Sequence, residues 1–389
     1  MSNPSQPRDL VLLGVGHTHL HLLREWQRRP LAGIRLTCIS NQPTAAYSGM
    51  LPGTLAGNYT SQEMQIDLSA RCAEVGAELI LAETTGLDRE RRQVLLRNRE
   101  PVSYDWLSIG IGSRPAEVPG IEESISIKPM QTFLSRLEQA VSAAMRDRGE
   151  AFPIRIVIVG GGAGGVEIAL CLPAWLARQR ALPSTGLPRY ELTVVQSDLR
   201  LLGDGNPRAA AIAERILARR GHRVLLGRTA VALEQQGVVT EQAGGERQLQ
   251  PADLIIWAVG AVAPRLFEQL GLARDERGFL LTNQYLQSVQ DPAIFVVGDA
   301  GTCQPAPHPK AGVYAVRQGP VLWENLRRTK HGLPLSAWQP QSHFLSLLNT
   351  GDCRAILQYR GFATHARWCW WLKDYIDRRF IAKHRAGAD

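Results

Sequence analysis

Two glycine-rich segments, each lying between an apolar run and a helical pattern, constrain this chain more than any other feature. Gly14-Val15-Gly16 follows the apolar run 9–13, and the run Gly160–Gly165, which is all glycine except Ala163, follows the apolar run 154–159. In such a strand–turn–helix unit the first glycine permits a tight turn and the second lets the backbone approach a pyrophosphate. The helix N-terminus then offers unpaired N–H groups to the anion. Each segment therefore predicts a dinucleotide-binding βαβ unit.

The first turn is less complete than the second. His19 stands where a third glycine is usual, and the next strand, residues 34–39, ends at Ser40 and Asn41 without the acid that commonly binds a ribose. A tight connection that binds no ligand stays open as an alternative for this turn. The second turn satisfies the G-x-G-x-x-G pattern with Gly160, Gly162 and Gly165.

The strand that follows the second turn bears on nucleotide choice. Residues 192–195 form an apolar run that ends at Gln196, with Arg200 close behind it. An acid at this position would bind the ribose 2′-hydroxyl of NAD, whereas glutamine does not repel a 2′-phosphate. The sequence therefore predicts that NADPH is used at least as well as NADH.

Length and composition place the chain among multidomain globular proteins. It has 389 residues, of which 44% are hydrophobic and 21% are charged, and it contains no apolar run long enough to span a bilayer. Residues 1–5 lack the basic and apolar regions of a signal peptide, and no two of the six cysteines have CxxC spacing. We expect a cytoplasmic protein without a zinc ribbon, a redox dithiol or a disulfide scaffold.

The net charge of +8 favours anionic partners. Nucleotides and acidic lipid headgroups fit that charge. Nothing in the chain resembles a nucleic-acid-binding module, so no nucleic acid partner is expected.

Three further segments complete a pattern that runs through the whole chain. Each is an apolar strand that ends in glycine: residues 104–109 precede Gly112 and Arg114, residues 253–259 precede Gly260, and residues 294–297 precede Gly298-Asp299. With the two turns, five motifs occur in order. The chain thereby resembles the two-dinucleotide-binding-domain flavoproteins, the pyridine nucleotide–disulfide oxidoreductase superfamily.

This resemblance implies an α/β fold with two Rossmann-like domains and a C-terminal cap. The FAD-binding domain would be discontinuous, with residues 1–118 and 279–332, around an NAD(P)H-binding domain of residues 119–278, and residues 333–389 would form the cap. Asp299 would place its carboxylate on the FAD ribitol. The other residues expected to contact the two cofactors, FAD and NAD(P)H, are Gly14, Gly16, His17, Ser40, Asn41, Gly112, Arg114, Gly160, Gly162, Gly165, Gln196, Gly260, Gly298 and Gly312.

A narrower likeness comes from residues 308–319, which look like the flavin-facing helix of type II NADH dehydrogenases and sulfide:quinone reductases. The N-terminus of that helix would favour negative charge on the flavin. Residues 16–19, 47–53 and 373–380 look closest to the flavoprotein domain found joined to selenide, water dikinase, which suggests a link with selenium metabolism.

The function that this likeness implies is an FAD-dependent NAD(P)H oxidoreductase that passes electrons to a small-molecule acceptor, with a quinone expected. Lys310 would act at the acceptor site, and Glu167 would position the nicotinamide. Two alternatives remain: flavin-dependent oxidation of sulfide or selenide, and a low-turnover partner protein of selenium metabolism. Cys303, with Cys353 as a partner in space, would carry sulfur chemistry, unless both are merely small thiols.

Histidines and aromatic residues pose two further questions. His17 and His21 would share a helix face but lack a nearby carboxylate, so packing beside FAD is expected and no metal site is predicted.

Residues 338–389 hold 9 of the 25 aromatic residues. Their helical stripe predicts peripheral contact with an anionic membrane, or docking against the flavin domain or a second subunit in a homodimer. The stripe consists of Trp368, Trp371, Leu372, Tyr375, Ile376 and Phe380.

Overall fold

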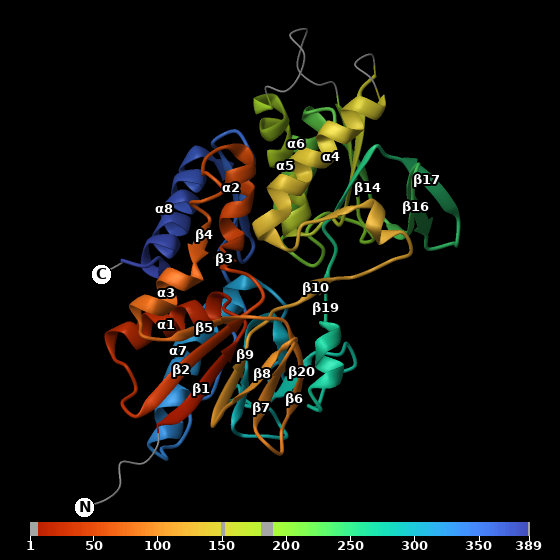
Figure 1. Ribbon diagram of the computed structural model, residues 1–389. Coiled ribbons are helices and arrows are strands. Elements are labelled where there is room, and N and C mark those ends of the chain that lie inside the picture. Colours follow the sequence, from red (N-terminus) through yellow and green to blue (C-terminus); the bar gives the residue numbers. More distant parts are fainter. Residues whose placement is uncertain (1–6, 149–151, 180–189, 388–389) are drawn as a thin grey trace, which may run out of the picture.

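The structure is a computed structural model that describes residues 7–148, 152–179 and 190–387. Two parallel sheets form the centres of two units, and a C-terminal segment lies against both of them (Figure 1). The fold is α/β, as the glycine turns predict.

The first unit is built on a five-stranded parallel sheet. Its strands, in spatial order, are β21 (Ile294–Val296), β9 (Trp106–Ile109), β1 (Arg8–Leu13), β2 (Ile34–Ser40) and β5 (Glu78–Leu81). Helices α1 (His17–Arg28) and α7 (Gly312–Lys330) pack against each other beside it. Leu10, Val11 and Leu12 are all buried because the sheet is covered on both faces.

The second unit repeats this arrangement. Its strands, in spatial order, are β11 (Ile125–Ser126), β18 (Leu254–Trp257), β12 (Ile154–Val159), β13 (Tyr190–Val195) and β14 (Arg223–Leu225). Its helices are α4 (Phe133–Arg148), α5 (Ala163–Arg178) and α6 (Pro207–Arg219).

Each unit also carries a three-stranded antiparallel sheet. In the first unit it consists of β6 (Thr84–Asp88), β7 (Gln93–Leu96) and β8 (Arg99–Ser103). In the second it consists of β15 (Arg228–Glu234), β16 (Gly237–Gln242) and β17 (Arg247–Pro251). Apolar residues of both sheets complete the cores of their units, as Val94 and Val238 show.

The chain crosses between the units twice, and the crossing strands β10 (Arg114–Pro115) and β19 (Ala261–Val262) pair antiparallel (Figure 1). The second crossing comes earlier than the sequence-based boundary at residue 278. Phe267 and Leu270 already pack with Val11 in the core of the first unit. Residues 265–278 therefore belong to the first unit, because their apolar side chains cover the face of its sheet.

The connections hold short elements. Between β2 and β5 lie β3 (Thr44–Ala46), α2 (Leu51–Ala56), β4 (Gln65–Asp67) and α3 (Leu68–Glu74). A parallel pair, β20 (Leu280–Thr282) and β22 (Gly301–Cys303), flanks the first sheet. The 3-10 turns are η1 (Ser48–Met50), η2 (Ile121–Glu123), η3 (Met130–Thr132), η4 (Arg265–Gln269) and η5 (Gly298–Ala300).

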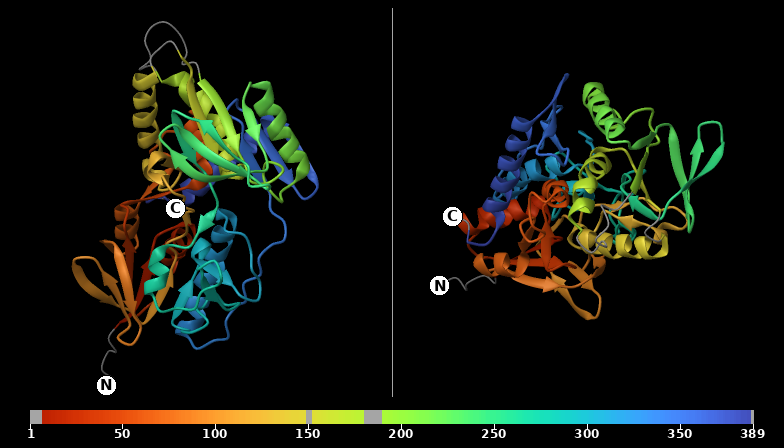
Figure 2. Two further views of the ribbon diagram at one scale, coloured as in Figure 1. Left: turned by 90° about the vertical axis from the view of Figure 1, so that its right-hand side faces the viewer. Right: turned by 90° about the horizontal axis from the view of Figure 1, so that it is seen from above.

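The C-terminal segment joins the two units. Its sheet consists of β23 (Ser346–Asn349), β24 (Ala355–Tyr359) and β25 (Phe362–Ala366), and α8 (Arg367–His384) follows. The sheet contacts α5 and α6 of the second unit, while α8 contacts α1 and β4 of the first (Figure 2). Within the described residues, no helix combines the length and apolarity needed to cross a membrane.

Candidate functional site

The first glycine turn is held in place by a histidine. Gly14 has φ +78°, and a Cβ there would lie 2.8 Å from Ile111, so only glycine fits. The His19 ring contacts Gly14 O through Nδ1 and lies 2.8 Å from Ser108 Oγ through Nε2. Burial lowers the pKa of His19 to about 4, so the ring is neutral and both of its nitrogens have partners. His19 thus ties the turn to β9.

Asp299 lies at the carboxyl edge of the first sheet, as its motif predicts. Ser113 Oγ donates to Asp299 Oδ2 at 2.9 Å, and Lys128 Nζ lies 3.8 Å from the same oxygen. The preceding Gly298 has φ +62°, and a Cβ on the nearby Gly112 would meet nothing within 4 Å. Lys128 was not predicted from the sequence, because only the folded chain brings it from the start of the second unit to this carboxylate.

The N-terminus of α7 reaches the same edge. Gln318 Oε1 accepts a hydrogen bond of 2.6 Å from Gly298 N, and Thr18 Oγ1 of α1 donates to Ala315 O at 2.6 Å. A Cβ on Gly319 would lie 2.7 Å from the His21 side chain, so α1 and α7 pack very closely. The N-termini of two long helices, Gly16 and Gly312, are thus brought to the edge that carries Asp299.

Lys310 does not extend freely from the start of α7. Its ammonium donates to Gly301 O and to Thr302 Oγ1, and it lies 4.1 Å from the centroid of the Phe279 ring. Burial lowers its pKa to about 8. The charge therefore faces β22, and the catalytic role expected for Lys310 stays a prediction.

Cys303 and Cys353 lie in different parts of the molecule. Cys303 is buried on β22 with its Sγ 3.6 Å from Asn283 O, and burial raises its pKa. Cys353 is exposed in the turn between β23 and β24, and both thiols are free. The partnership considered from the sequence does not form.

The second glycine turn has the geometry of a phosphate cradle. Gly160 has φ +106°, and a Cβ on Gly165 would lie 1.8 Å from Gly160 O, so α5 packs directly on β12. Gly162, at the N-terminus of α5, has no atoms within 4 Å of its Cβ position. Gly260, beyond the neighbouring β18, is equally open. The open edge beside an α-helix N-terminus fits a dinucleotide pyrophosphate.

The strands that follow the two glycine turns, β2 and β13, end in different polar contacts. In the first unit, Ser40 Oγ accepts from Gln42 N at 3.1 Å within its own turn, and Asn41 is exposed. In the second unit, Gln196 Oε1 accepts from Gly161 N at 2.7 Å, and Gln196 Nε2 donates to Asp198. Asp198 was missed because the sequence interpretation looked for the ribose-binding acid only at the first residue after the strand.

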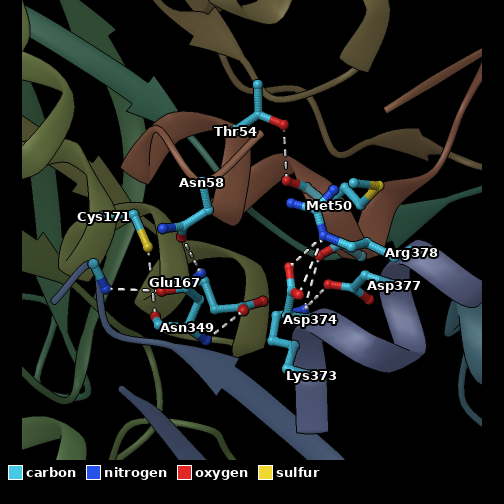
Figure 3. Close-up of polar contacts among 12 residues, drawn as sticks. Met50, Thr54, Asn58, Glu167, Cys171, Asn349, Lys373, Asp374, Asp377 and Arg378 are labelled. Carbon is cyan, nitrogen blue, oxygen red and sulfur yellow. Dashed lines mark hydrogen bonds and ion pairs between the residues drawn. The ribbon is translucent and has the colours of Figure 1, made fainter. Parts of the chain in front are cut away.

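A polar cluster lies where the two units and the C-terminal segment meet (Figure 3). Glu167 of α5 accepts from Asn349 N of β23 at 2.8 Å. On α8, Lys373 Nζ donates to Asp377 Oδ2 at 3.0 Å and to Gly49 O at 2.8 Å. Lys373 and Asp377 are only 6% and 2% exposed, so the buried face of α8 is charged.

The cluster shifts the pKa of its members. Burial raises the pKa of Glu167 to about 7, although Lys373 opposes the shift. Burial would lower the pKa of Lys373, but the carboxylates of Glu167 and Asp377 raise it. Burial also raises the pKa of Asp377 and of Tyr47, which hydrogen-bonds to it. The sequence analysis identified Glu167 but not Lys373 and Asp377. The only signal for these two in the sequence was a lysine and an aspartate four residues apart in a helix rich in aromatic residues.

The aromatic stripe of α8 is largely exposed. Trp368, Trp371 and Tyr375 are 49%, 60% and 56% exposed, whereas Phe380 stacks on Tyr47 at 4.0 Å between ring centroids. The helix therefore docks against the first unit, but mainly with a face other than the predicted stripe.

His17 lies beside Tyr47 and Phe380, each ring centroid 5.5 Å away. Burial lowers its pKa to about 4. Within the part of the chain that the structure describes, no three metal-ligating side chains gather into a site.

A family model described as pyridine nucleotide-disulphide oxidoreductase matches residues 8–319, which include both glycine turns and Asp299. The chain belongs to this pyridine nucleotide–disulphide oxidoreductase family. The chain binds FAD and NAD(P)H. The open carboxyl edge of each parallel sheet fits one of these two dinucleotides.

Relatives of this chain include proteins named NADH dehydrogenase-like and a quinone reductase. An NADH dehydrogenase-like protein of Mycobacterium tuberculosis is 30% identical over 247 residues, which cover 62% of this chain and 59% of the relative. Demethylphylloquinone reductase of Synechocystis is 26% identical over 72% of this chain and 69% of its own length. The chain thus matches about three fifths of the length of the mycobacterial relative.

Two solved structures share the fold over almost the whole chain. The sulfide:quinone oxidoreductase of Aquifex aeolicus superposes with a TM-score of 0.81 at 18% identity, over 98% of this chain and 92% of the other. NDH2 of Plasmodium falciparum, solved with NADH, has a TM-score of 0.80 at 12% identity, over 98% and 99%.

Proposed function

We propose that this family member is an FAD-dependent NAD(P)H oxidoreductase that reduces a quinone. The observation that carries the proposal is the cluster of Glu167, Lys373 and Asp377, which joins the nucleotide-binding α5 to the first unit. Bound FAD supplies the two-electron chemistry between nicotinamide and acceptor, and the chain supplies orientation and protons.

The proton supply favours a quinone. Two-electron reduction of a quinone to a hydroquinone consumes two protons, so a protein group that is protonated near neutral pH assists it. Glu167 has a pKa of about 7, and Lys373, whose pKa is raised, is a cation beside it. Glu167 can therefore hold and release one proton at the junction while Lys373 favours negative charge on an acceptor oxygen.

The names of relatives support the same acceptor. They include demethylphylloquinone reductase of Synechocystis and an external alternative NAD(P)H-ubiquinone oxidoreductase of Arabidopsis thaliana.

Sulfide or selenide oxidation is the weaker alternative. It calls for a thiolate beside the flavin, and burial disfavours the thiolate form of Cys303, the cysteine nearest to the Asp299 motif. A role in selenium metabolism rests on the likeness of short segments alone.

The proposal is tested with Glu167→Gln, which keeps the shape of the side chain and removes its titration. We expect reduction of the flavin by NADH to persist and turnover with a soluble quinone to fall about tenfold to a hundredfold. Turnover with ferricyanide, whose reduction needs no proton, should be unchanged. Equal losses with both acceptors, or no loss with either, would contradict the proton-donor role.

We also propose that the exposed aromatic residues of α8 contact the surface of an anionic membrane. Trp371 and Tyr375 lie on the outer face of the helix, with Arg379 beside Tyr375. Interfacial aromatic residues next to cations bind such surfaces.

The double variant Trp371→Glu with Tyr375→Glu should abolish sedimentation with anionic vesicles. Leu199→Glu, which alters an exposed apolar residue of the second unit, should not. A change in oligomeric state without any loss of vesicle binding would instead assign this face to a second subunit.

A further inference from the structure

The polar contacts beyond β13 bear on which nicotinamide nucleotide the second unit accepts. Gln196 occupies the position where the ribose-binding acid is usual, but its amide is already engaged. Oε1 accepts from Gly161 N at 2.7 Å, and a Cβ on Gly161 would lie 2.9 Å from Gln196 Cβ. Gln196 therefore packs beneath the glycine turn and holds its shape, instead of facing outward to a ligand.

The same amide orients a carboxylate. Gln196 Nε2 donates to Asp198 Oδ2, and Asp198 O accepts from Gly227 N at 2.9 Å. Asp198 is exposed, unlike the buried Gln196, and it follows β13 at the same carboxyl edge of the sheet where the open Gly162 follows β12. The Asp198 carboxylate, a hydrogen-bond acceptor, thus lies two residues beyond the position where the ribose-binding acid is usual. Hydrogen bonds hold both the backbone and the side chain of Asp198.

Two nearby arginines already donate hydrogen bonds to other groups of the protein. Arg200 Nε donates to Gly203 O. Arg228, whose backbone N donates to Gln196 O, directs its guanidinium to Gln242, 2.6 Å from the amide oxygen in the orientation that satisfies both groups. A 2′-phosphate, which carries about −1.5 to −2 charges, would therefore meet the Asp198 carboxylate, while Arg200 Nε is already bonded and the remaining nitrogen of Arg228, Nη1, is buried.

We propose that Asp198 is the specificity-determining residue of the nucleotide site: it accepts hydrogen bonds from the adenosine ribose hydroxyls of NADH and repels the 2′-phosphate of NADPH. Gln196 acts through it as a positioning residue. This reverses the expectation drawn from Gln196 and Arg200 in the sequence. The inference rests on the nucleotide site of the proposed function and does not depend on the acceptor.

The test measures binding rather than turnover, so its failure is distinct from failure of the quinone proposal. ADP-ribose and 2′-phospho-ADP-ribose are titrated calorimetrically into the FAD-loaded protein. We expect ADP-ribose to bind at least about tenfold more tightly, because like charges placed together are costly. In Asp198→Asn the ratio of the two dissociation constants should move toward the phosphorylated ligand by about tenfold or more.

Asp204→Asn is the matched control, because it makes the same change in net charge at an exposed residue of the same connection. It should leave the ratio unchanged. The assignment is overturned if the wild-type protein binds both ligands equally, or if Asp204→Asn shifts the ratio as much as Asp198→Asn does.

Discussion

Glu167 shows how one residue acquires its chemistry from its surroundings. Burial disfavours its ionised carboxylate, and the charge of Lys373, which would favour it, is already paired with Asp377. The carboxyl responds by keeping its proton up to about pH 7. A glutamate that follows a glycine turn is therefore more than a helix residue with a free side chain.

The pH dependence of stability follows from this shift. The folded-state pKa of Glu167, about 7, lies above its ordinary value of 4.5, so its contribution to stability is complete below pH 4.5 and is lost as the pH rises through 7. Relative to the wild-type protein, Glu167→Gln should gain up to about 3 kcal/mol in free energy of unfolding between pH 5 and pH 8. Urea denaturation at both pH values measures it.

Glu90→Gln is the control for this measurement, since Glu90 is exposed. Its free energy of unfolding should follow that of the wild-type protein at both pH values. A parallel pH profile for Glu167→Gln as well would show that Glu167 is ionised in the folded protein at pH 5.

At the scale of the element, α8 turns a charged face inward and an aromatic face outward. Its buried positions include Lys373, Asp377 and His384, while Trp371 and Tyr375 are exposed. The inward charges are accepted because Gly49 O, Tyr47 and Glu167 supply partners that only the docked helix meets. A buried pair of this kind is sensitive to the loss of one member.

Lys373→Met should lower the free energy of unfolding at pH 8 by about 3–5 kcal/mol, because it leaves Asp377 and Glu167 as buried carboxyls without a cation. At pH 5 the loss should be smaller, since both carboxyls have raised pKa values and can take up protons. Arg378→Met removes exposed pairs with Asp374 on the same helix and with Glu63, and should cost less than about 1 kcal/mol. Equal losses from the two variants would show that burial of the pair has no energetic consequence.

At the scale of the whole molecule, the two nucleotide-binding units are joined by more than the crossing strands. Arg178 at the end of α5 donates to Ala56 O and to Leu55 O at the end of α2, both at 2.6 Å. The guanidinium thus caps a helix of the first unit from the second. Asn206 Nδ2 donates to Arg360 O at 2.9 Å and ties the C-terminal sheet to α6.

Arg178→Met should lower the free energy of unfolding by about 1.5–3 kcal/mol, since it removes charged hydrogen bonds to carbonyls at the interface. It should also speed hydrogen exchange at residues 55–58, where α2 ends. Arg208→Met, which removes an exposed contact of 3.5 Å with Gly361 O, should have little effect on either quantity. Unchanged exchange at residues 55–58 in Arg178→Met would show that the arginine does not hold the two units together.

The sequence by itself determined the features that depend on local geometry. Gly14 and Gly160 predict their turns because each has a positive φ that glycine adopts without strain, and Gly165 because a Cβ would clash with Gly160 O of the same βα unit; the apolar runs predict the parallel strands that carry them. Asp299 follows from its place directly after such a strand. These signals extend over a few tens of residues, so the fold class, both glycine turns and the two cofactors could be predicted.

Only the tertiary structure decided which distant side chains meet. Lys373 joins Glu167, Asp198 rather than Gln196 is exposed beside the second turn, and Lys310 faces β22. Helical periodicity separates the faces of α8 but does not say which face is buried. That depends on the hydrogen-bonding partners that another unit offers, and these partners come together only when the elements dock.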